Sequence, residues 1–81
     1  MKLSWVTKSS GQKHYCYDET DKVVGYVFES FSTSICIAHM KDKEQNYFVL
    51  GEYIKLNSAK NALEEKYHND RNRYLLSGDL L

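Results

Sequence analysis

Hydrophobic and polar residues alternate with a short period along the first part of the chain. Runs of alternating or apolar character cover residues 3–7, 14–17, 23–28, 34–40 and 47–50, and short polar stretches separate them. Such runs are typical of β-strands, and connections this short join neighbours that lie antiparallel. The pattern therefore predicts a meander of four to five antiparallel strands.

Beyond Gly51 the apolar residues recur at a helical spacing. Asn57 or Ser58 is expected to cap the start of this helix, and Gly78 is expected to end it. One helical face is predicted to carry Ala59, Ala62, Leu63, Tyr67 and Tyr74. This apolar stripe needs a partner, and an apolar face of the sheet is the surface available to it.

The expected fold is α+β, an antiparallel β-meander of four to five strands packed against one long C-terminal helix. The 81 residues suffice for one domain, so residues 1–81 are predicted to form a single domain. One helix covers only one face of a sheet, and the other face should stay open. Gly25, inside an apolar run, predicts a bulge or the close approach of a neighbouring side chain.

Aromatic residues are the unusual part of the composition: seven Tyr, three Phe and one Trp. Tyrosine is amphipathic and is enriched at interfaces, although cross-strand packing also uses it. We expect Trp5 in the core. The residues expected to bind a partner are Tyr15, Tyr17, Tyr26 and Phe31, because the tyrosines cluster on neighbouring strands and Phe31 is large for a turn.

Charge narrows the class of partner. Eleven Lys and Arg balance 11 Asp and Glu, whereas proteins that bind nucleic acid through phosphates are usually basic. The basic residues are spread along the chain without clustering, so a protein partner is favoured over nucleic acid. No apolar run is long enough for a membrane span or a secretory leader, which predicts a cytoplasmic protein without a membrane partner.

The reactive side chains do not form a recognisable catalytic or metal-binding pattern. Cys16 and Cys36 lie in apolar runs and are expected to be buried free thiols. His14 shares a strand face with Cys16, whereas His39 and Cys36 should point to opposite faces. Zinc requires about four convergent ligands, and no paired cysteine motif is present. The sequence therefore predicts no metal, no cofactor, no catalytic residue and no enzyme activity.

Several segments together resemble small proteins encoded by bacteriophages and other mobile elements. They are Trp5 near the start, VVGYV at 23–27, LGEY at 50–53 and SAKNALEE at 58–65. That group includes anti-CRISPR and other anti-defence inhibitors that block host machinery. The resemblance implies that the protein is located in the cytoplasm of a bacterial host and that its partner is a host or phage protein complex. A CRISPR effector is the most specific partner that it implies.

A second resemblance covers residues 47–67 only. LGEY followed by AKNALE is similar to the last strand and helix of AP2-like domains, including the arm-binding domains of phage integrases. It implies contact between the sheet face and duplex DNA. The basic residues near the predicted strands are few: Lys13, His14, Lys22 and Lys41.

Three functions are therefore carried forward. The leading hypothesis is a protein-binding inhibitor or modulator that acts by steric occlusion. The alternative is an AP2-like DNA-binding domain that uses its sheet face. The third is self-assembly through a sheet edge or face, which would give a homodimer.

Overall fold

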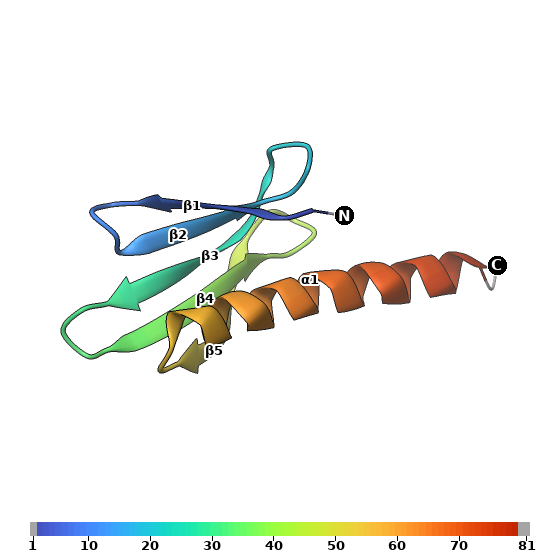
Figure 1. Ribbon diagram of the computed structural model, residues 1–81. Coiled ribbons are helices and arrows are strands. Elements are labelled where there is room, and N and C mark those ends of the chain that lie inside the picture. The colour runs from blue at the N-terminus through green and yellow to red at the C-terminus, as the bar shows by residue number, and fades with distance from the viewer. Residues whose placement is uncertain (1, 80–81) are drawn as a thin grey trace.

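The computed structural model describes the backbone of residues 2–79 and the side chains of residues 2–70. The strands lie side by side in chain order and form one antiparallel sheet, and a single long helix follows them (Figure 1). The elements are β1 (Ser4–Lys8), β2 (Lys13–Tyr17), β3 (Val23–Ser30), β4 (Ile35–Lys41), β5 (Tyr47–Tyr53) and α1 (Leu56–Asp79). The predicted α+β architecture is confirmed, with five strands.

Aspartates organise two of the tight turns between strands. The side chain of Asp18 accepts hydrogen bonds from the backbone N–H groups of Thr20 at 2.8 Å and Lys22 at 3.1 Å. Asp42 plays the same role between β4 and β5, with two bonds of 2.9 Å. Such local bonds replace a backbone turn and favour a sharp reversal. The carboxylates of Asp18 and Asp42 thus help to form these two turns.

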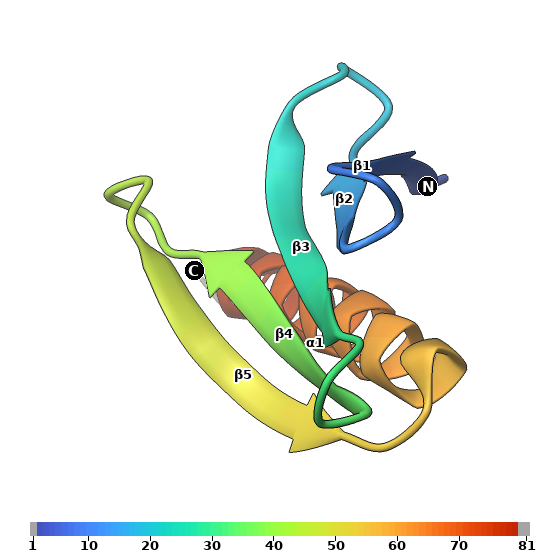
Figure 2. The same cartoon turned by 90° about the vertical axis from the view of Figure 1, so that its left-hand side faces the viewer.

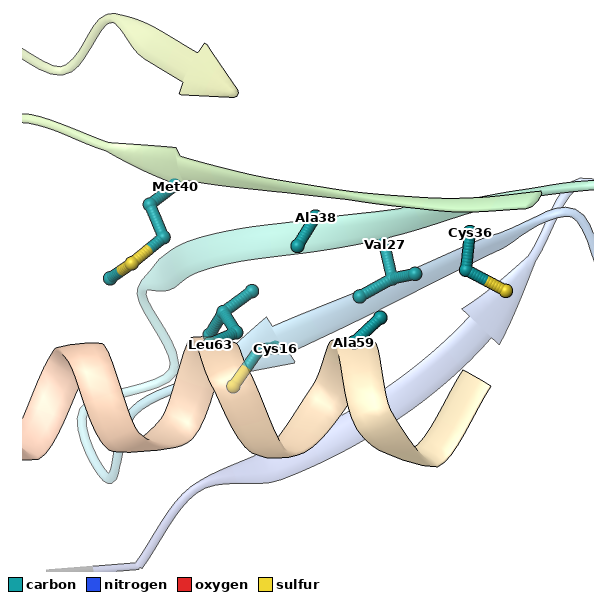
Figure 3. Close-up of a cluster of buried hydrophobic side chains, with 7 residues drawn as sticks. All are labelled: Cys16, Val27, Cys36, Ala38, Met40, Ala59 and Leu63. Carbon is teal, nitrogen blue, oxygen red and sulfur yellow. The ribbon is translucent and has the colours of Figure 1, made fainter. Parts of the chain in front are cut away.

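The hydrophobic core lies between α1 and one face of the sheet (Figure 3). Burial alternates along β4, where Cys36, Ala38 and Met40 are buried and the residues between them are half-buried. This alternation confirms the period of two in the sequence. The buried apolar side chains are Cys16, Val27, Cys36, Ala38, Met40, Ala59 and Leu63.

Gly25 marks the point where β3 comes closest to its neighbours. A Cβ atom at this position would lie 2.3 Å from the carbonyl oxygen of His39 and 3.0 Å from Cδ1 of Leu63. The pairing of β2 with β3 also shifts register between Cys16 and Tyr17, next to Gly25. Both consequences expected of this glycine, a bulge and a close approach, are therefore present.

Trp5 connects the edge strand β1 to the helix. Its indole N–H donates to Oε2 of Glu64 at 2.7 Å, and the Nζ atom of Lys60 lies 5.1 Å from the ring centroid. The ring is half-buried and packs against the core, as expected from the sequence. These contacts hold β1 against the helix.

Most of the predicted strand ends differ from the observed ones by one to three residues, and the boundaries around the helix were also wrong. β5 does not end at Gly51 but continues to Tyr53, whose ring lies over the glycine: a Cβ atom at Gly51 would be 2.9 Å from the Tyr53 hydroxyl. The helix begins at Leu56, which packs against the core, so Asn57 and Ser58 lie in its first turn.

At the other end, the helix continues through Gly78 to Asp79. Tyr74 and the late-helix arginines lie outside the residues whose side chains are described. Figure 1 shows this last part of α1 extending past the sheet. Within residues 2–79, no helix combines the length and the apolar character needed to cross a membrane.

A candidate binding face on the open side of the sheet

The sheet face opposite α1 is not covered by any other described element. In Figure 2 the helix lies behind β3 and β4. The strand register places Tyr15 opposite Tyr26, and Tyr26 opposite His39, so their side chains share this face. We call this surface the open face. Its aromatic and basic members are Lys8, Lys13, Tyr15, Tyr17, Tyr26, Phe28, His39, Lys41 and Tyr47.

Aromatic rings form a connected row across the middle of the open face. The Tyr26 ring stacks on His39, with centroids 4.4 Å apart and planes 9° apart. Tyr15 packs against the same ring at 5.5 Å, and Tyr47 meets it edge-on at 5.0 Å. Rings from four adjacent strands thus form one connected set with Tyr26 at its centre.

Lysines are interleaved with these rings. Lys8 lies over Tyr15 and Tyr17, with Nζ 5.4 Å and 5.9 Å from the two centroids. Lys13 lies 5.7 Å from the centroid of Tyr26. The contacts are within cation–π range, so each ammonium group has a defined place on the face.

Lys41 completes the set, 5.4 Å from the Tyr47 centroid. The strands carry only two carboxylates: Glu29, which lies on the helix side, and Glu52, which lies on the open face opposite Ile37. The open face is therefore net positive although the chain is neutral. The antiparallel register pairs Lys8 with Lys13 and places Lys41 on the same face, so lysines that are spread along the sequence share one surface.

Two titratable groups of the row are held neutral. Burial lowers the pKa of His39, and the nearby Lys13 ammonium lowers it further. Burial raises the pKa of the Tyr47 phenol, and the neighbouring Tyr15, Tyr26 and Tyr17 add to this rise. The Tyr47 hydroxyl stays protonated and able to donate a hydrogen bond, and the positive charge resides on the lysines.

The structure brings three of the four predicted partner-binding residues together. Tyr15, Tyr17 and Tyr26 lie on the open face, whereas Phe31 lies in the β3–β4 turn with 59% of its surface exposed. Phe31 and Ile54 line a separate hollow of about 160 Å³, together with Glu29, Ser30, Ser34 and Cys36. Cys36 is a core residue, so this hollow is on the helix side of the sheet.

Sequence reasoning did not name Lys8, His39 and Tyr47 as members of the open face. Lys8 closes β1 and looks like a turn residue when only the chain is read, and Tyr47 was predicted in a strand but was not named among the binding residues. The alternation of β4 did place His39 on the face away from Met40. The same alternation assigns the residues of each strand to one face or the other. The strand register is also needed to show which of them lie next to one another.

The covered side holds a polar relay around His14, which is 5% exposed. Oγ1 of Thr7 lies 2.9 Å from Nδ1 of His14, and Oε1 of Glu29 lies 3.0 Å from Nε2. His14, named among the basic residues near the strands, is thus buried away from the open face. The three residues join β1, β2 and β3 and satisfy a buried imidazole.

A hydroxyl, an imidazole and a carboxylate are also the parts of a nucleophilic triad. Such a triad needs space for a substrate beside its hydroxyl group. The hollow on this side contacts Glu29, but Thr7 is not among its lining residues. The arrangement therefore fits a structural polar contact between strands.

The cysteines are buried and free, as expected. Burial raises the pKa of Cys16 to about 12, and the nearby carboxylates of Glu64 and Asp18 contribute to the rise. Burial also raises the pKa of Cys36. Both thiols therefore stay protonated, which makes them poor nucleophiles.

Comparison with family models, with curated proteins and with solved structures found no match to this chain.

Proposed function

We propose that this protein is a non-catalytic binding module of the bacteriophage or mobile-element type, which inhibits or modulates a protein complex in the bacterial cytoplasm. It binds its partner through the open face, and it acts by sterically blocking part of the surface of that partner. The most specific form of the proposal is an anti-CRISPR protein that covers part of a CRISPR effector. The observation that carries it is the row of packed tyrosines interleaved with Lys8, Lys13 and Lys41 on an uncovered sheet.

The packing of the rings favours a protein partner. Tyr26 is contacted by His39, Tyr15 and Tyr47, and Lys13 lies over it. A nucleic-acid base stacks on a free ring surface, and the central Tyr26 ring is already occupied by these neighbours. Rigid tyrosines that offer edges and hydroxyl groups are instead typical of surfaces that bind proteins, where they lose little entropy on binding.

Charge specifies the partner further. Three ammonium groups and one carboxylate on the open face complement an acidic protein surface. CRISPR effectors and other nucleic-acid-binding complexes are expected to be basic where they hold nucleic acid, so the proposed contact lies on an acidic patch outside that channel. The module then blocks a conformational change or the docking of another component.

An affinity pull-down of the tagged protein from bacterial lysate, with and without nuclease, tests this proposal. We expect a stoichiometric protein partner that is retained after nuclease treatment. Recovery of no stoichiometric protein would contradict the proposal.

A second candidate function is nucleic-acid binding through the same face, and the clustering of lysines favours it. It corresponds to the AP2-like alternative, although this sheet has five strands and the domains of that type insert three into the major groove. It predicts a mobility shift with duplex DNA whose affinity falls steeply as salt rises. In the pull-down, partners that disappear with nuclease would move this candidate to first place.

A further inference from the structure

The two edge strands of the sheet differ in length and in chemistry. β1 has five residues, among them Ser4, Thr7 and Lys8, whereas β5 has seven residues with a single charged side chain, Glu52. Proteins protect sheet edges with short strands, charges and especially lysine. β1 is protected in this way, but β5 is not.

Exposed apolar side chains gather at the β5 edge. Six large hydrophobic residues are exposed among the side chains that the structure describes, and four of them lie between positions 47 and 54. Val49 is 59% exposed, and Ile54, directly after the strand, is 83% exposed. Tyr47 and Val49 lie on the open face and Phe48 lies on the helix side, so both faces of this edge are apolar. Surfaces of this kind mark interaction sites.

We propose that β5 pairs with β5 of a second copy of this chain, in an antiparallel arrangement that joins two sheets into one. A strand at the end of the sheet order leaves the backbone groups of every other residue unpaired on its outer side, and a second strand satisfies them. This interface lies at an edge of the sheet and borders the open face, with which it shares Tyr47.

The chemistry of the edge favours a second copy over a foreign strand. Antiparallel pairing about a two-fold axis near Phe48 places Tyr47 of each copy opposite Val49 of the other, so the apolar segments of the two chains meet. The strand offers no charge pattern that would select a charged foreign strand. The net charge of the chain is zero, so two copies do not repel each other.

Paired substitutions test the proposal. Val49→Lys places a charge at the β5 edge, and Val6→Lys places the same charge on the same sheet face at the β1 edge, where Val6 is 43% exposed. Molar mass is measured by light scattering over a range of concentrations. Circular dichroism and the fluorescence of Trp5 verify that both variants fold.

We expect the wild-type protein and Val6→Lys to reach twice the chain mass of 9.5 kDa as concentration rises, and folded Val49→Lys to stay at 9.5 kDa. Hydrogen exchange adds a second readout: amides of β5 should gain protection with concentration, and those of β1 should not. A wild-type protein that stays at 9.5 kDa up to about 1 mM, where even a weak dimer with a millimolar Kd would be visible, overturns the proposal. So does a Val49→Lys variant that dimerises like Val6→Lys.

Discussion

The two faces of this sheet are built from the same strands, yet they use their side chains differently. The covered face buries small and aliphatic residues such as Val27, Ala38 and Met40 under the helix. The open face carries tyrosines and lysines that pack on one another and stay partly exposed. One face thus stabilises the fold and the other is available to a partner. Substitutions on the two faces should therefore separate stability from binding.

The largest effect on stability is expected from Leu63, a fully buried helix residue that approaches Gly25. Leu63→Ala leaves a cavity between helix and sheet and should cost about 2–5 kcal/mol of the free energy of unfolding. Val6→Ala on the open side of β1 should change it by less than about 1 kcal/mol. Urea unfolding followed by Trp5 fluorescence measures both. Equal losses would mean that the covered face is not the main core.

A smaller loss of the free energy of unfolding is expected when the hydrogen bonds of the His14 relay are removed. His14→Leu removes the imidazole that bonds to Thr7 and Glu29 and should cost about 1–3 kcal/mol. The control is Lys66→Ala, which breaks an exposed helix pair with Asp70 and should cost less than about 0.5 kcal/mol. A His14 variant as stable as the wild-type protein would show that the relay contributes nothing to the covered face.

His39 adds a pH dependence on the open side. Its pKa is lowered in the folded protein from the ordinary value of 6.5, so the unfolded chain binds the proton more readily. The stability due to neutral His39 is full above pH 6.5 and is lost as pH falls through the folded-state pKa. His39→Phe keeps an aromatic ring beside Tyr26 and should flatten this part of the pH profile of unfolding. An unchanged profile would contradict the burial of this imidazole.

The alternation of residues along each strand was sufficient to predict the meander and the burial of both cysteines, and the helical spacing beyond Gly51 was sufficient to predict the helix. Element ends were less predictable: Gly51 lies within β5, where the Tyr53 ring packs over it, and Gly78 lies within the helix. The clustering of Lys8, Lys13 and Lys41 depends on the strand register, which a single sequence does not reveal. The same register separates Phe31 from the tyrosines with which it was grouped.

The central claim is that the open face binds the partner, and a charge-reversal experiment tests it most directly. Lys8, Lys13 and Lys41 are changed together to Glu, and a matched variant carries Glu at Lys22, Lys43 and Lys55, which are exposed outside the strands. Both variants have the same net charge, and each is used as bait in the pull-down. We expect the matched variant to recover the partner like the wild-type protein, and the open-face variant to lose it. Retention of the partner by a folded open-face variant would contradict the account.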